Sequence, residues 1–269
     1  MSDELIALSA AQKQQFESEG FLIVKQLFAP EEIEEIDRTF MEMSLAPIPN
    51  CFDPVMEDNS PDPLRRYPRM LHPHKVSPVA MKYMMDSRVF DILHDLFGRE
   101  ALAAQSMYYF KPPGARGHAL HQDNFYLKVQ PGTCIAAWTA VDAADEENGG
   151  MMLVPQTNND PLVCPELADE KESFTKHFVP VPAGKKAVLA KMDKGDVLFF
   201  NGSTIHGSYR NRTKDRFRKA FISHYVDEAT EQIGRFYNPL YRLDGTPVEI
   251  PVDWDSGPCG NAFDELYPH

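Results

Sequence analysis

The feature that most constrains the fold is a change in the residue pattern, from helical to β-type, at about residue 101. Beyond that point, short apolar β-type runs are separated by Gly, Asn and Asp turn chemistry. The strands that we predict are 104–111, 134–141, 151–155, 186–191, 196–200 and 218–226, with turns at 147–150 (ENGG) and 194–196 (KGD). Many short strands at fairly even spacing favour a jelly roll of the cupin kind, whose mouth can hold a ligand.

The first 100 residues predict helices that flank this mainly β body. Ser9 can cap a helix that runs to about Glu19, where Gly20 ends it before the apolar strand-like run 21–28. Further helices are predicted at 30–44, 77–85 and 87–97, the last with Ser87 as its cap and Gly98 as its terminator. The proline-rich stretch 45–68 is interpreted as a long loop.

Length and composition predict one domain over 1–269, made of a helical N-terminal region (residues 1–100), a β core (101–227) and a tail (228–269). The net charge of −13 works against binding to nucleic acid or to an anionic membrane surface. The N-terminus lacks the pattern of a signal peptide, and no run of about 18 apolar residues occurs, so we expect a cytoplasmic protein. The widely spaced Cys51, Cys134, Cys164 and Cys259 are expected to be reduced.

Three residues form a candidate metal site. His121 and Asp123 are two positions apart, so on an extended strand they would point to the same face, and His206 follows 83 residues after Asp123. A jelly roll brings such distant strands side by side. Two imidazoles and one carboxylate form the facial triad of non-haem iron(II) enzymes, although a His-x-Asp pair alone is weak in a chain with nine histidines and 40 acidic residues.

Arg218 strengthens this interpretation. It lies 12 residues after His206 and beside the apolar run 220–222. 2-Oxoglutarate chelates iron through its keto oxygen and the adjacent carboxylate, so its distal carboxylate needs a planar, bidentate donor such as arginine. The neighbouring Arg210, Arg212 and Arg216 are interpreted as a solvated basic turn.

Longer motifs carry a family resemblance. HQD, AWTAVD, ENGGMMLVP, GDVLFFNGSTIHGS and RFRKAFISHY, within about residues 10–227, resemble the phytanoyl-CoA dioxygenase family. The resemblance implies a double-stranded β-helix. It implies iron ligation by His121, Asp123 and His206, and 2-oxoglutarate binding by Ser208 and Arg218. At 154–159 (VPQTNN) the chain departs from the Pro-Gly-Ser/Thr-His turn that members often carry.

Other polar and apolar residues have two interpretations. Met107 and Trp138 match further cosubstrate contacts of the family, with core packing as the alternative. Lys75 is a third candidate, for which His72 or His74 would serve as well. We expect His118 at the mouth of the site, facing away from Asp123, and His224 to be a satisfied core or cavity histidine. Three residues that flank the triad could line the mouth, namely Gln122, Asn124 and Tyr126.

The resemblance implies an enzyme that uses Fe(II), 2-oxoglutarate and O2, with ascorbate as a supporting reductant. The expected reaction is hydroxylation of a small-molecule substrate with release of succinate and CO2. Because Asp123 occupies the third ligand position, no place is left for a halide ligand. The alternatives are desaturation, epoxidation or cyclisation, a zinc-dependent hydrolase or isomerase, and a metal- or ligand-binding module without turnover. The loop 45–68 and the tail 228–269 either close over the site or pack on the exterior.

Overall fold

Two antiparallel sheets of unequal size form the body of the computed structural model, which describes residues 6–56, 60–254 and 259. The large sheet has the order β1-β10-β5-β12-β3-β14-β15, with β2 paired to β3, and the small sheet has the order β4-β11-β6-β9. The large sheet contains β1 (Phe21–Val24), β2 (Met70–Leu71), β3 (Ala101–Tyr109), β5 (Ile135–Ala140), β10 (Val197–Asn201), β12 (Ala220–Asp227), β14 (Leu240–Tyr241) and β15 (Pro247–Val248). The small sheet contains β4 (His118–His121), β6 (Met151–Leu153), β9 (Val188–Ala190) and β11 (His206–Ser208).

Side chains of the large sheet alternate between two apolar layers, as the pleat requires. On the inner face Trp138 lies opposite Ile222, which in turn lies opposite Met107, and this layer packs against Met151 of the small sheet. On the outer face Tyr108 is buried against the helices, with its ring 4.0 Å from that of Phe40. The inner face therefore lines the space between the sheets, while the outer face is covered.

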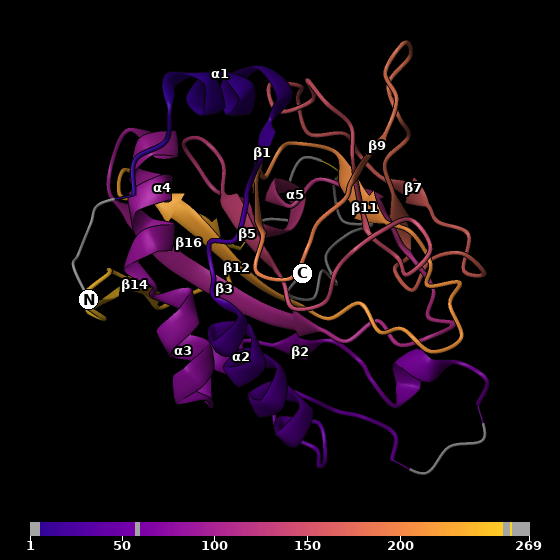
Figure 1. The fold of residues 1–269 in the computed structure, drawn as a ribbon. Coiled ribbons are helices and arrows are strands. Elements are labelled where there is room, and N and C mark those ends of the chain that lie inside the picture. The colour runs from indigo at the N-terminus through magenta and orange to yellow at the C-terminus, as the bar shows by residue number, and fades with distance from the viewer. Residues whose placement is uncertain (1–5, 57–59, 255–258, 260–269) are drawn as a thin grey trace.

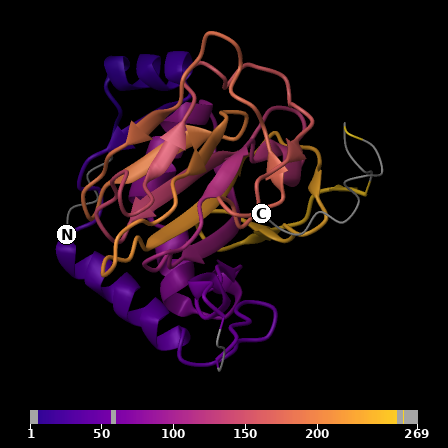
Figure 2. The same cartoon turned by 90° about the vertical axis from the view of Figure 1, so that its right-hand side faces the viewer.

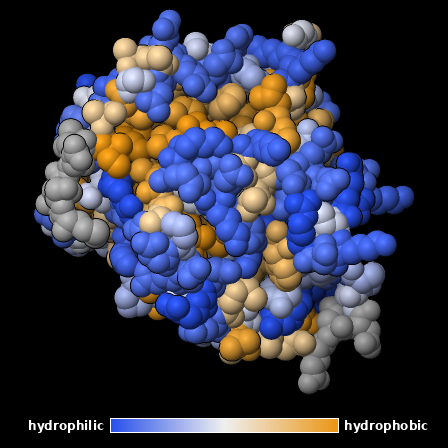
Figure 3. Space-filling model, in the orientation of Figure 1, coloured by the Kyte–Doolittle hydropathy of each residue, from blue (hydrophilic) through white to orange (hydrophobic). Residues whose placement is uncertain are grey.

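The covering layer comes from the N-terminal region of the chain. The helices are α1 (Ala10–Glu19), α2 (Pro30–Met43), α3 (Pro78–Met84), α4 (Ser87–Phe97) and the short α5 (Asn124–Leu127), with 3-10 turns η1 (Pro63–Arg65) and η2 (Pro73–Lys75). Figure 1 shows α2, α3 and α4 on one side of the large sheet, with β11 on the opposite side. Most of the surface on this view is hydrophilic, apart from an apolar area in its upper half (Figure 3).

Most of the helix ends were predicted correctly. Ser9 accepts a hydrogen bond from the backbone N–H of Gln12, and Gly20 ends α1 with a left-handed φ of 85°. The cap of α4 was wrong, because Asp86 rather than Ser87 accepts the hydrogen bond from the N–H of Arg88. The strand expected over 21–28 ends at Val24, where the chain turns and Asp196 accepts hydrogen bonds from Lys25 and Gln26.

The segment between β6 and β9 covers the outer side of the small sheet. Figure 2 shows this segment beside the sheets, and Val179 within it packs against Leu120 and Ile205. It includes the paired strands β7 (Glu166–Leu167) and β8 (His177–Phe178). Residues 154–159, where the chain departs from the family's turn, lead into this segment.

The described portion of the tail packs on the large sheet. β14 pairs with β3, and Tyr237 and Leu240 are buried in one cluster with Leu102. β13 (Ile233–Gly234) and β16 (Val252–Asp253) form a parallel pair. Exterior packing, one of the two alternatives for the tail, is therefore the arrangement for residues 229–254. Residues 255–258 and 260–269 lie outside the described residues.

Two cysteines correct the expectation of four reduced thiols. Cys164 and Cys259 form a disulfide, with 95 residues between them in sequence and 5.5 Å between their Cα atoms, while Cys51 and Cys134 are free and buried. The fold brings the pair together, which their spacing could not indicate. Because reducing compartments disfavour disulfides, this bond argues against the cytoplasmic location, which stays a prediction. Among the described residues, no helix has the length and apolarity that a membrane span needs. The single domain also stays a prediction.

Candidate active site

The candidate metal ligands converge from two neighbouring strands of the small sheet. β4 and β11 pair so that His121 lies opposite His206. The Nε2 atoms of both rings lie 3.4 Å from Oδ1 of Asp123, and the three candidate ligand atoms are within 4.8 Å of one another. All three side chains are buried. The structure therefore brings together the three residues that the sequence pattern predicted.

Backbone carbonyls orient both imidazoles. Nδ1 of His121 donates to the carbonyl of Ala119 at 2.7 Å, and Nδ1 of His206 donates to that of Thr204 at 2.9 Å. With the proton on Nδ1, the Nε2 lone pair of each ring faces the shared centre, as a metal ligand requires. Burial, together with the adjacent His206, lowers the pKa of His121 to about 4, so this ring is neutral near pH 7.

A fourth side chain supports the carboxylate. Nε2 of His224, which lies on β12 of the large sheet, donates to Oδ2 of Asp123 at 3.0 Å. Burial alone would raise the pKa of Asp123, but the surrounding imidazoles outweigh burial and hold this pKa well below the usual value. The carboxylate is thus ionised and turns Oδ1 toward the two candidate ligands. His224 is buried and lines the cavity, in agreement with the expected core or cavity position.

The geometric argument for Asp123 was wrong in one respect. β4 ends at His121, and Asp123 has helical dihedrals (φ −60°, ψ −37°) at the start of α5, so the two side chains meet across a strand end rather than on one strand face. The pairing of the same strand also shows that the expected orientation of His118, away from Asp123, was wrong. A register shift in the pairing of β4 with β11 places His118 on the side of His121, with ring centroids 4.0 Å apart.

A cavity extends from the metal ligands between the two sheets. Its walls include Met107, Trp138 and Ile222 of the large sheet, and it is also lined by Ser208 and Arg218, whose part of the cavity is called the far end. Met107 and Trp138 therefore line the same cavity as the candidate metal ligands. Lys75 is an exposed residue of η2 and is not among the residues that line this cavity.

The far end is positively charged. Arg218 is buried, its Nε donates to the carbonyl of Gly149 at 3.0 Å, and its guanidinium carbon lies 5.1 Å from the ring centroid of Trp138. One terminal nitrogen of Arg218 is buried without a hydrogen-bond partner among the described residues. Burial lowers the pKa of Arg218 to about 10, which still leaves it charged at pH 7. A buried, incompletely bonded guanidinium matches a carboxylate ligand.

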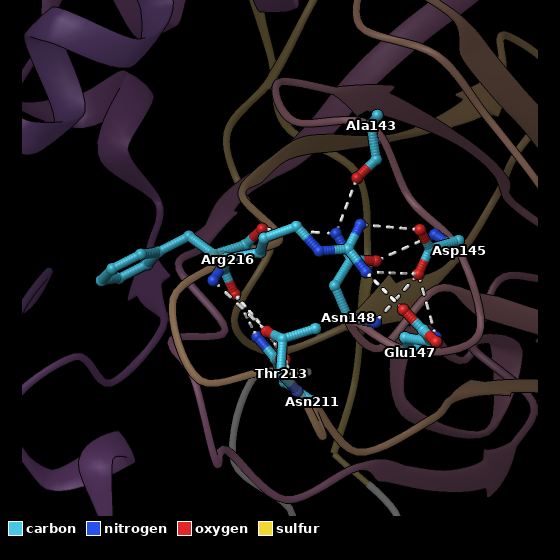
Figure 4. A network of polar contacts seen from close by, with 8 residues as sticks. Ala143, Asp145, Glu147, Asn148, Asn211, Thr213 and Arg216 are labelled. Carbon is cyan, nitrogen blue, oxygen red and sulfur yellow. Dashed lines mark hydrogen bonds and ion pairs between the residues drawn. The ribbon is translucent and has the colours of Figure 1, made fainter.

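The turn that carries Gly149 is fixed by the segment before Arg218. Figure 4 shows Arg216 reaching across to two acidic residues, and its terminal nitrogens lie 2.8 Å from Oδ2 of Asp145 and 3.1 Å from Oε2 of Glu147. Asn148 donates to the carbonyl of Ala143 at 2.8 Å. The side chain of Arg216 is 41% exposed, as expected for a solvated turn, and it pairs with carboxylates that lie 69 and 71 residues earlier in sequence.

Two of the residues expected at the mouth have other roles. Gln122 donates to the carbonyl of Ser203 and accepts from the N–H of Val163, while Asn124 accepts from the N–H of Val129. Both side chains therefore hold backbone rather than line the cavity. The ring of Tyr126 does lie near the candidate ligands, 6.2 Å from that of His121.

Sequence reasoning missed Lys111. Its Nζ is buried and donates to Oγ of Ser208 at 2.8 Å, and also to the carbonyl of Tyr209. The available signal was a lysine placed directly between an aromatic run and two prolines, in MYYFKPP. A lysine whose side chain is exposed to solvent does not require aromatic and proline neighbours.

The comparisons with known proteins agree with this geometry. The sequence model of the family described as "Phytanoyl-CoA dioxygenase (PhyH)" matches residues 16–220, which include all three candidate metal ligands. The chain belongs to the phytanoyl-CoA dioxygenase family. The rat peroxisomal phytanoyl-CoA dioxygenase (Rattus norvegicus) is 28% identical over 232 residues, which cover 81% of this chain and 68% of the rat protein. The predicted family and enzyme class, an iron- and 2-oxoglutarate-dependent dioxygenase, are thereby confirmed.

Solved structures confirm the fold class. The carbocyclase SnoK from nogalamycin biosynthesis, named as 2-oxoglutarate (alpha-ketoglutarate) dependent, superimposes with a TM-score of 0.66 at 18% identity, over 90% of this chain and 94% of SnoK. EctD from S. alaskensis, solved with 2-oxoglutarate and 5-hydroxyectoine, gives 0.65 at 20% identity, over 86% of this chain and 79% of EctD. The phytanoyl-CoA dioxygenase fold observed here is thus the double-stranded β-helix that the resemblance implied.

Proposed function

We propose that this protein hydroxylates a small-molecule substrate, with release of succinate and CO2 from 2-oxoglutarate. His121, Asp123 and His206 would hold Fe(II), and Ser208 and Arg218 would bind the distal carboxylate of 2-oxoglutarate. The observation that carries the proposal is the pairing of both ends in one cavity, with a two-imidazole, one-carboxylate site at one end and a buried guanidinium at the other. A zinc hydrolase would have no use for that guanidinium.

The donor set fits iron. Two imidazole nitrogens and one carboxylate oxygen lie within 4.8 Å of one another, a donor set that suits a six-coordinate ion that keeps open positions. When bound, the iron supplies the oxidising chemistry together with 2-oxoglutarate and O2. The polypeptide fixes the ligand tautomers, and holds the distal carboxylate so that the keto acid faces the metal.

The cavity wall supports oxidation of an organic substrate. Met107, Trp138 and Phe200 are buried and apolar, so this wall keeps water from the reacting atoms. Hydroxylation is favoured over halogenation because Asp123 provides a carboxylate at the third ligand position. The EctD structure contains a hydroxylated small molecule, 5-hydroxyectoine, whereas SnoK is named a carbocyclase, so related folds support more than one oxidative outcome.

The test is 2-oxoglutarate turnover by purified protein with Fe(II) and ascorbate. Succinate should form above the level of an Asp123→Ala control, and more strongly when the correct substrate is added. The product should gain one oxygen atom by mass. Loss of two hydrogen atoms instead would indicate desaturation or cyclisation. Succinate that never exceeds the Asp123→Ala level with any substrate would exclude catalysis and leave a non-catalytic ligand-binding protein.

A further inference from the structure

Lys111 is a second basic residue near the far end of the cavity, where its Nζ contacts the cavity-lining Ser208. It lies just beyond β3, directly before two prolines, and only 2% of its surface is exposed. Neither Lys111 nor Arg218 forms an ion pair with a carboxylate within the portion of the chain that the structure describes. Burial without a carboxylate partner disfavours the charged form of both side chains, and an anion that bound beside them would stabilise it.

The local structure is built to admit this lysine. Gly149 has a φ of +92°, and a Cβ at this position would lie 2.5 Å from Cδ of Lys111 and 2.9 Å from the carbonyl oxygen of Tyr209. A residue with a side chain would therefore collide with Lys111. The carbonyl of the same Gly149 accepts the hydrogen bond from Nε of Arg218, and the carbonyl of Lys111 accepts one from the N–H of Arg218. One turn thus positions both cations.

The hydrogen bond to Ser208 has a direction. In its protonated form Lys111 has three donors and no acceptor, so Oγ of Ser208 then accepts from Nζ of Lys111 at 2.8 Å. The hydroxyl proton of Ser208 is then turned away from Lys111 and is available to the cavity, which Ser208 lines together with Arg218. The carbonyl of Tyr209 takes a second proton of Lys111 and holds the ammonium in place.

We propose that Lys111 is a positioning residue for the distal carboxylate of 2-oxoglutarate, acting through Ser208. Its ammonium directs the Ser208 hydroxyl toward that carboxylate and adds a second positive charge beside Arg218. This inference rests on the proposed function. It goes beyond the residues that the family resemblance supplies, and it explains why the site selects a 2-oxo acid with a second carboxylate.

The test measures binding rather than turnover. Isothermal titration calorimetry gives the affinity of Mn(II)-loaded protein, under anaerobic conditions, for two probes. 2-Oxoglutarate carries the distal carboxylate, and 2-oxobutanoate shares its chelating end without it. Lys111→Met should weaken 2-oxoglutarate binding about 10- to 100-fold, the range for a lost charge-assisted hydrogen bond, and leave 2-oxobutanoate binding unchanged. A merely structural role would weaken both probes or neither, and either result would overturn the proposal.

Matched variants separate the possible failures. Lys219→Met removes the lysine that directly follows Arg218 in the chain, whose Nζ pairs with Asp37, and should leave both affinities unchanged. Lys111→Gln keeps a donor for the carbonyl of Tyr209, and should show the same selective loss if Lys111→Met does not fold. In a Ser208→Ala background the effect of Lys111→Met should shrink, and full additivity would overturn the route through Ser208. Wild-type protein that binds metal but no 2-oxoglutarate would overturn the proposed function itself.

Discussion

The two ends of the cavity carry opposite charges. At the metal end a single carboxylate, that of Asp123, is surrounded by imidazoles, of which His121 is held neutral by burial. At the far end two cations, Lys111 and Arg218, are buried side by side, and burial lowers the pKa of both. One end therefore matches a cation and the other an anion. A metal–dicarboxylate pair satisfies both ends at once, which a lone metal or a lone acid does not.

The two ends also differ in construction. The metal end depends on the pairing of β4 with β11 and on two backbone carbonyls, so few side chains outside the triad support it. The far end depends on side chains and turns from four distant segments around 111, 149, 208 and 218. Variants at the metal end should therefore change the affinity for the metal, and variants at the far end should change the affinity for the cosubstrate.

The largest effect is expected from Asp123→Ala. Removing the only carboxylate of the triad leaves two imidazoles as ligands, so Mn(II) affinity should fall by more than about 100-fold, beyond the range known for residues that only support a ligand. Calorimetric titration with Mn(II) measures this. A variant with unchanged metal affinity would show that the metal end has been assigned to the wrong residues.

The second largest effect is expected from Arg218→Leu. It removes the charge-assisted hydrogen bonds to the distal carboxylate, so the 2-oxoglutarate concentration for half-maximal binding should rise roughly 100-fold while Mn(II) affinity stays the same. Both quantities come from the same titration series. Loss of metal affinity in this variant would mean that the two ends are not independent.

The metal end could be predicted from the sequence because its chemistry is local. His121 and Asp123 are two residues apart, and His206 follows an apolar strand, so residue type and spacing indicated them, with Arg218 and the family motifs as further support. The structure brings these residues together, but the geometric argument contained one wrong step, since a strand end and a register shift in β4 cannot be seen in a single sequence. Helix ends such as Ser9 and Gly20 were predictable for the same reason of local chemistry.

The far end was only partly predictable because its contacts are long-range. Arg218 and Ser208 followed from the cosubstrate chemistry and the family motifs, but nothing near Lys111 in sequence indicates Ser208, 97 residues later. His224 likewise meets Asp123 across 101 residues, and Cys164 meets Cys259 across 95. Such contacts between residues far apart in sequence can be recognised only in the folded structure.

A smaller effect on the metal end is expected from His224→Phe. The phenyl ring keeps the volume but not the N–H that donates to Oδ2 of Asp123, so Mn(II) affinity should fall about 10-fold, as for other residues that orient a metal ligand. His224→Gln can still donate and serves as the matched control. Equal losses in both variants would point to packing rather than to the hydrogen bond.

The smallest effect is expected for proton uptake at Lys111. It tests directly whether the far end of the cavity is more positively charged than the metal end. Burial, and then the charge of Arg218, hold the pKa of Lys111 well below its usual value in the protein alone, whereas a bound carboxylate would raise it. Binding of 2-oxoglutarate should therefore take up a fraction of a proton between the lower and the higher pKa. The affinity should accordingly be greatest below the lower pKa and fall as pH rises toward the higher one.

Calorimetry in buffers of different ionisation enthalpy measures this uptake directly. Lys111→Met should abolish it, while Lys219→Met, whose lysine pairs with Asp37, should preserve it. Uptake that persists unchanged in Lys111→Met would place the titrating group elsewhere in the cavity. The positive charge of the far end would then rest on Arg218 alone, and the contrast between the two ends would reduce to one carboxylate against one guanidinium.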